Sequence, residues 1–112
     1  MTLEQCSLCG MCRTSCPIYR LSFKETTSPR GFAVLGKRGI SDEVIYQCTL
    51  CGACKEACPA KVDLELEKAR ENLIKRRIET EAGKRMLANI REFGNPFGKL
   101  EKGSKPKELF CC

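Results

Sequence analysis

The chain has 112 residues, enough for one domain but near the lower limit for burying a hydrophobic core without a further source of stability. Lysine and arginine outnumber aspartate and glutamate by 20 to 14, yet tryptophan is absent and aromatic residues make up only 6% of the chain, which argues against a nucleic-acid-binding surface. No apolar run approaches the length of a membrane span, and we expect no signal peptide before Cys6.

The N-terminal segment leads into a run of closely spaced cysteines. Residues 1–5 are expected to form a helical turn, which is followed by the run Cys6-Ser-Leu-Cys9-Gly-Met-Cys12-Arg-Thr-Ser-Cys16-Pro17. Another helical turn is predicted over residues 13–16. We expect the apolar side chains of residues 18–21 to pack over whatever the cysteines bind.

Two short helices are predicted between this run and a second one. Ser28 suits the N-cap of the first helix and Pro29 its first position. Its apolar face lies within residues 32–35, and Gly36 or Gly39 ends it. The second helix is capped by one of two residues and then carries three apolar side chains: Ser41 or Asp42, followed by Val44, Ile45 and Tyr46.

The second run of cysteines is a copy of the first. It reads Cys48-Thr-Leu-Cys51-Gly-Ala-Cys54-Lys-Glu-Ala-Cys58-Pro59, lies 42 residues after the first, and has the same residue at seven of twelve positions. Both runs have the spacing C-x2-C-x2-C-x3-C-P, by which bacterial-type ferredoxins hold [4Fe–4S] clusters. Gly10 and Gly52 stand where each loop must turn sharply, and glycine reaches positive φ without strain. The repeat therefore predicts two [4Fe–4S] clusters.

The fourth cysteine of each run is expected to serve the other cluster, as it does in two-cluster ferredoxins. Crossed ligation of this kind would hold the two halves together and keep the clusters close enough to exchange electrons. The predicted ligands are Cys6, Cys9, Cys12 and Cys58 for one cluster, and Cys48, Cys51, Cys54 and Cys16 for the other. Eight thiolates and two doubly positive cores would change the formal charge from +6 to about +2.

Other uses of these cysteines fit the pattern less well. Disulfides are disfavoured, because two matched runs with no expected secretion signal are typical of metal binding. A zinc or other structural metal site stays an alternative. Zinc favours paired C-x2-C motifs or added histidines, however, and the chain has no histidine.

The C-terminal half reads as helix followed by a linker. Asp63 is a suitable N-cap for a long helix, whose apolar residues recur at intervals of three and four: Leu66, Ala69, Leu73, Ile74 and Ile78. Its opposite face is charged, which we interpret as a solvated face, with a partner-docking patch at Lys75-Arg76-Arg77 as the alternative. Residues 80–83 are predicted to break the helix. A further apolar stripe over residues 86–93 stops at Gly94-Asn95-Pro96.

No segment shows the alternation of a strand, so the predicted fold is all-α. We predict a dicluster domain over residues 1–97 and a linker or tail over residues 98–112. The chain ends on Cys111 and Cys112. These two cysteines either belong to an ordinary tail with spare thiols or mark the start of a further cysteine-rich domain.

Several of these motifs together resemble a known family. They are the two cysteine runs, Ser-Pro-Arg-Gly at residues 28–31, and Val62-Asp63. They are similar to the α-helical ferredoxin domain of glycolate/lactate oxidase iron–sulfur subunits and of heterodisulfide reductase C- or D-type subunits. The C-terminal domain of succinate dehydrogenase and fumarate reductase iron–sulfur subunits is similar in fold. The resemblance covers residues 5 to about 95 and implies an α-helical ferredoxin with two cluster-binding loops.

In these families the domain conducts electrons between a flavin or thiol–disulfide site and another carrier. The resemblance thus implies a non-catalytic electron-transfer component of a flavoprotein-linked oxidoreductase, in some cases in a quinone-linked complex at a membrane. We expect a cytoplasmic location, because clusters of this kind are assembled in a reducing compartment. The alternative is a disulfide-reducing subunit that uses Cys111 and Cys112. Tyr46 has two interpretations, a gatekeeper for electrons or quinone and a cover that keeps water from a cluster.

Overall fold

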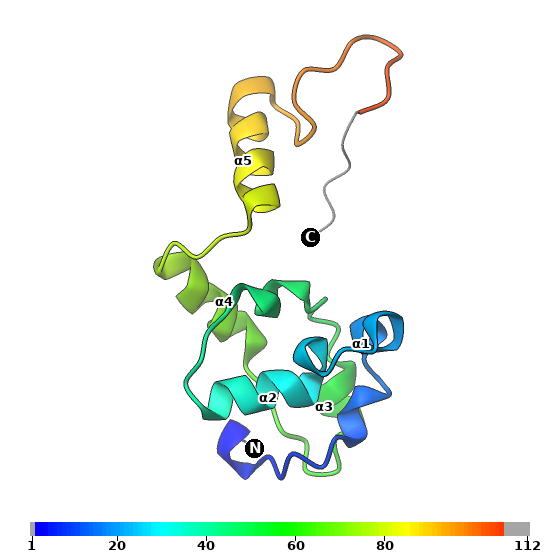
Figure 1. Ribbon diagram of the computed structural model, residues 1–112, viewed down its shortest axis with the longest axis vertical. Helices are drawn as coiled ribbons and strands as arrows, with labels where there is room; N and C mark the ends of the chain where they lie inside the picture. The colour runs from blue at the N-terminus through cyan, green and yellow to red at the C-terminus, as the bar shows by residue number, and fades with distance from the viewer. Residues whose placement is uncertain (1, 107–112) are drawn as a thin grey trace. The chain divides into compact units, whose positions relative to one another are not determined.

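A computed structural model describes residues 2–106. Within this range the regular structure is helical, with no strand, as the sequence predicts (Figure 1). The α-helices are α1 (Pro17–Ser22), α2 (Pro29–Lys37), α3 (Ala53–Ala57), α4 (Leu66–Lys75) and α5 (Glu81–Phe93). Short 3-10 helices lie at Leu3–Gln5, Met11–Arg13, Glu25–Thr27 and Glu43–Gln47. None of the described helices is both long and apolar enough to cross a membrane.

The chain divides into two compact units, Met1–Ile78 and Glu79–Cys112. The first contains both cysteine runs and α1 to α4. The sequence predicts a boundary after residue 97, between a dicluster domain and a tail, whereas the two compact units are divided after Ile78. The boundary after residue 97 stays a prediction.

The core of the first unit is small. Phe32 of α2, Ile45 of the 3-10 helix Glu43–Gln47 and Leu73 of α4 are buried against one another. Half-buried side chains surround them, among them Leu64, Ala69 and Ile78. Three elements that are far apart in the sequence therefore meet at one point, and the two cysteine runs are connected through them.

The first helix boundaries agree with the predicted caps. Ser28 Oγ accepts a hydrogen bond from Gly31 N–H at 2.9 Å, and Pro29 is the first residue of α2. The helix ends at Lys37, and Gly39 follows with φ +66°. Asp42 caps the next element by accepting from Val44 N–H at 3.1 Å.

Two predictions about α4 are wrong. Asp63 is not its N-cap, because the helix begins at Leu66 after Glu65, whose φ is +50°. Asp63 instead accepts hydrogen bonds from Lys55 Nζ at 2.7 Å and from Glu65 N–H at 2.9 Å. The helix also ends earlier than predicted, at Lys75, because Arg77 adopts φ +56° and breaks it.

The second unit is described by itself. Thr80 caps α5 by accepting from Gly83 N–H at 3.1 Å, so residues 80–83 start this helix. Gly94 ends it with φ +74°, as the predicted stop at residues 94–96 requires. Asn89 Nδ2 donates to Pro96 O at 2.9 Å, which folds the following loop back onto the helix.

Candidate iron–sulfur sites

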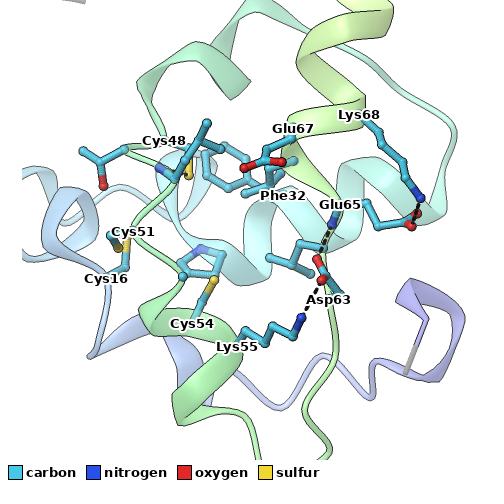
Figure 2. A pocket seen from close by; sticks show the side chains of 16 residues that line it. Cys16, Phe32, Cys48, Cys51, Cys54, Lys55, Asp63, Glu65, Glu67 and Lys68 are labelled. Atoms are coloured by element: carbon cyan, nitrogen blue, oxygen red, sulfur yellow. Dashed lines mark hydrogen bonds and ion pairs between the residues drawn. The ribbon is translucent and has the colours of Figure 1, made fainter.

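The structure gathers the eight cysteines of the two runs into two groups of four. Cys48, Cys51, Cys54 and Cys16 line a cavity of about 350 Å³, which we call the second site (Figure 2). Cys6, Cys9, Cys12 and Cys58 line a cavity of about 100 Å³, the first site. Each site thus combines three cysteines of one run with the fourth of the other. These are the two sets predicted from the sequence, and their ligation of clusters stays a prediction.

The two loops that carry the first three cysteines have the same backbone. Leu8 and Leu50 occupy the left-handed region at φ +58° and +56°, and Gly10 and Gly52 follow at φ +83° and +74°. The glycines bear out the expectation of positive φ. The positive φ of the two leucines was not expected, because a bulky residue is strained in this region. The strain recurs at the same place in both copies, so it is part of the loop and not an accident of one.

The fourth cysteines lie where helices begin or end. Cys16 is the N-cap of α1, and its Sγ accepts from Tyr19 N–H at 3.5 Å. Cys58 follows α3 with φ −78° and ψ 121°, nearly the values of −81° and 121° at Cys16. The proline after each cysteine has a fixed φ and no N–H group, and so it fixes the direction in which the chain leaves the site.

The thiols at equivalent positions have equivalent electrostatics. The backbone N–H of Met11 lowers the pKa of Cys9, and that of Ala53 lowers the pKa of Cys51. Burial raises the pKa of Cys12 to about 11 and also raises that of Cys54. N–H groups directed at sulfur stabilise a thiolate, and at a cluster they stabilise added negative charge.

Burial also raises the pKa of Cys48, the first ligand of the second site. The N–H of Leu50 donates to its Sγ at 3.3 Å and opposes that rise. A buried thiolate needs positive charge beside it to stay ionised, and the irons of a cluster supply that charge.

The segment Ser28-Pro-Arg-Gly31 supports the first site. Ser28 is fully buried, and its hydroxyl donates to Glu25 O at 2.8 Å while it caps α2. Arg30 lines the first site, and its charge contributes to lowering the pKa of Cys9. At Gly31 an added Cβ would collide with the backbone oxygen of Glu25, so only glycine fits. Pro29 is buried, starts α2 and lines the second site, so the segment contacts both sites.

A salt-bridge pair covers the loop of the first site. Glu25 accepts from Arg13 at 3.0 Å and lies 3.6 Å from Arg30 Nε. Both arginines lie over Gly10, where an added Cβ would meet Arg13 Nε at 3.2 Å and Arg30 Cδ at 3.3 Å. The Arg13 guanidinium also lies 5.6 Å from the centre of the Tyr19 ring.

Arg70 of α4 supports the second site from behind Cys48 without lining its cavity, and sequence reasoning missed it. The interpretation as part of a solvated face is wrong for this residue, which is half-buried. Its Nη2 donates to the carbonyls of Ile45, at 3.3 Å, Tyr46, at 3.0 Å, and Cys48. Its charge lowers the pKa of Cys48 against the effect of burial. In the sequence this arginine is one of several charged residues on the same helix face. Nothing in that pattern indicates that it donates to backbone carbonyls beside Cys48.

Two further expectations concern side chains near the cysteine runs. Tyr46 lines neither cavity; its hydroxyl donates to Ile78 O at 2.8 Å and its ring packs on the core, so its two interpretations stay predictions. Leu21, expected to pack over a site, is 82% exposed. Cys111 and Cys112 lie outside the described residues.

The residues of both sites fit [4Fe–4S] clusters by their donor chemistry. Each cavity presents four thiols, the ligand set of such a cluster. Across residues 2–106 no three cysteine, aspartate or glutamate side chains come together tightly enough to hold a single metal ion. A cubane spreads its four thiolates over separate irons, whereas one zinc ion draws them to about 2.3 Å from a common centre. A bound cluster would supply one-electron redox chemistry, while the loops hold it and limit access of water.

Comparison with known protein families identifies the chain. Residues 2–62 match the model of the 4Fe-4S dicluster domain. That stretch covers more than half of the 112 residues and contains both cysteine runs. No curated protein matches the chain. The protein therefore belongs to the 4Fe-4S dicluster domain family and has two [4Fe–4S] clusters as its cofactors.

Proposed function

Because the protein belongs to the 4Fe-4S dicluster family, we propose that it transfers electrons as a non-catalytic component of a flavoprotein-linked oxidoreductase. The observation that carries the proposal is the sharing of cysteines between sites. Cys58 of the second run completes the first site, and Cys16 of the first run completes the second. Two clusters that share a scaffold in this way lie close together, as a path for single electrons requires.

The ligands proposed for each cluster are the four cysteines of each site. The first three come from one tight loop, and the fourth is presented by the turn before Pro17 or Pro59. Each loop contributes backbone N–H groups to sulfur, at Cys9 and Cys51 in particular. The protein thereby holds the cluster and stabilises the extra negative charge of its reduced form.

The proposed partner is a flavoprotein or another redox subunit. This rests on the resemblance of the two runs, of Ser28–Gly31 and of Val62-Asp63 to glycolate/lactate oxidase iron–sulfur subunits and heterodisulfide reductase subunits. A quinone-linked complex at a membrane surface is one form that such an assembly takes in these families. The proposal includes a cytoplasmic location, because clusters of this type are assembled in a reducing compartment.

The experiment is iron and sulfide analysis combined with EPR spectroscopy of protein purified without oxygen. We expect about eight irons per chain and, on full reduction, a signal split by coupling between two paramagnetic clusters. One or two metal ions per chain without such a signal would contradict electron transfer and favour zinc.

Crossed ligation is tested by Cys58→Ser with Cys16→Ser as its counterpart. Cys58→Ser should alter the cluster held by Cys6, Cys9 and Cys12, although it lies in the other run. Cys16→Ser should alter the other cluster. If each substitution disturbs the cluster of its own run instead, the proposed ligand sets are wrong.

A further inference from the structure

The two cysteine loops have the same backbone but different surroundings. Gly10 is buried beneath Arg13 and Arg30, and Leu8 is half-buried. Gly52 is exposed with nothing within 4 Å of an added Cβ, and Leu50 is 39% exposed. The second cysteines, Cys9 and Cys51, are both exposed, so the difference lies in the cover over each loop and not in the ligands.

The cavity at the second site extends beyond the space its four cysteines enclose. Its volume of about 350 Å³ compares with about 100 Å³ at the first site, although both sites would hold the same cofactor. The additional walls come from α4 and the segment before it, and include Leu64 and Leu66. Glu67 lies beside them on α4 (Figure 2). The second site therefore opens into a groove with an apolar floor beside Leu50.

The rims of the two sites differ in charge. The second site is lined by three carboxylates and two ammonium groups, from Lys55, Asp63, Glu65, Glu67 and Lys68. Lys55 forms a salt bridge with Asp63 at 2.7 Å, and Lys68 forms one with Glu65. These charges cancel in pairs, so the lining keeps one net negative charge, on the carboxylate of Glu67. The first site is lined by one charged side chain, the cation Arg30. The cation Arg70 lies behind Cys48 and does not line the cavity. With cluster cores of equal charge, the lining of the second site is therefore more negative than the lining of the first.

We propose that the surface formed by Leu50, Gly52 and the groove up to Glu67 is where a basic redox protein docks and exchanges electrons with the second cluster. This inference rests on the proposed electron-transfer function and names the face and charge of the partner. An apolar centre excludes water over the shortest path to the cluster. The negative rim attracts a partner with positive charge around its own redox centre.

Leu50 is well placed to form that centre. A leucine at φ +56° is strained, and the first loop carries the same strain at Leu8. Each leucine lines its own cavity, but Leu8 is half-buried and Leu50 is 39% exposed. The second loop thus leaves its leucine more accessible to a partner.

The experiment measures electron transfer from the fully reduced protein to cytochrome c, a basic haem protein used as the probe. One electron passes from a reduced cluster to the ferric haem, so the cluster returns to its oxidised state as the haem becomes ferrous. The rate is followed by stopped-flow absorbance without oxygen at several salt concentrations. For the wild type we expect the rate to fall as salt rises, because screening weakens attraction between opposite charges.

Matched variants assign the face. Glu67→Lys should slow the reaction at least threefold at low salt, whereas Glu4→Lys, an exposed change just before the first run, should leave it unchanged. Leu50→Asn should slow it at every salt concentration, whereas Leu21→Asn, an exposed apolar change on α1, should not. Asparagine tolerates the left-handed backbone, so the loop at Leu50 keeps its conformation.

The outcomes separate this inference from the function on which it rests. Each variant is first checked for about eight irons and an unchanged EPR signal, and a wild type without two reducible clusters would refute the function itself. Equal effects of the paired variants, a larger effect at Glu4 or Leu21, or a rate independent of salt would overturn the docking surface while leaving electron transfer intact. A small neutral quinone is the last probe. If the protein reduces it fast, Leu50→Asn slows that reaction, and salt has no effect on the reaction with cytochrome c, then the groove receives a small molecule and not a protein.

Discussion

Replacing Arg70 by methionine tests whether the protein sets the potentials of its two clusters separately. Arg70 Nη2 donates to the carbonyls of Ile45, Tyr46 and Cys48, and its guanidinium lies 5.9 Å from the centre of the Tyr46 ring. Methionine keeps much of the apolar stem but removes the charge and all three hydrogen bonds. The residue is half-buried, so solvent screens this charge less than it would a surface ion.

The expected shift follows from Coulomb's law. Arg70 donates to the carbonyl of the ligand Cys48, and we take the charge to act on the cluster over about 8 Å. In a medium of effective dielectric constant about 20, a unit charge at that separation changes the energy of an added electron by about 2 kcal/mol. That is about a 30-fold change in the reduction equilibrium, or about 90 mV for one electron. Residual access of solvent reduces the figure, and we expect the potential of the second cluster to fall by about 50–90 mV.

The assay is a redox titration followed by EPR, in which the two clusters give separate waves. Arg70→Met should move one wave to lower potential, and Arg30→Met at the first site should move the other. Arg76→Met is the control, because Arg76 is an exposed residue just after α4 and should move neither wave by more than about 15 mV. The reasoning fails if Arg70→Met and Arg30→Met move the same wave, or if Arg70→Met has no more effect than the control.

Three further predictions concern stability. Gly31→Ala should destabilise the protein by about 2 kcal/mol, since the collision with the Glu25 carbonyl outweighs the gain in helix propensity. Gly36→Ala in the same helix meets only the flexible Leu3 side chain and should be nearly neutral. Anaerobic thermal unfolding compares the two variants. Tyr46→Phe should cost about 1 kcal/mol by removing the bond to the carbonyl of Ile78, and an unchanged melting temperature would contradict it. Chelating the iron should abolish most of the helical circular dichroism of the first unit, because so few of its side chains are buried; a cooperative transition that survives chelation would show that the unit folds without its clusters.

The features that the sequence predicts best are those fixed by local chemistry. The spacing of the cysteines determines the loop, and positive φ at Gly10 and Gly52 follows from the turn each loop makes. The caps at Ser28 and Asp42 are hydrogen bonds to a backbone N–H two or three residues later, and so the residue type alone is enough to predict them. The prediction of an all-α fold holds over residues 2–106 because no segment alternates polar and apolar residues.

What the sequence does not predict depends on contacts between distant segments. Asp63 looks like an N-cap, yet Lys55 and the backbone of Glu65 take its carboxylate. Arg70 stands in a row of charged residues, and only the packing of α4 on the 3-10 helix Glu43–Gln47 directs it to the end of that helix. Periodicity gives the face on which a residue lies but not which carbonyl groups of another segment it will meet.

The two sites show how a duplicated loop becomes two unequal ones. The loops agree in backbone and in the pKa shifts of their second and third cysteines, and the two runs are identical at seven of twelve positions. Most of the difference therefore comes from neighbours outside the repeat. Glu25 and Arg30 cover the first loop together with Arg13, which stands where the second run has Lys55, while α4 brings Arg70 to Cys48 and Gly52 has no neighbour over it. Direction along a path of two similar clusters requires such a difference, and here the surrounding helices supply it.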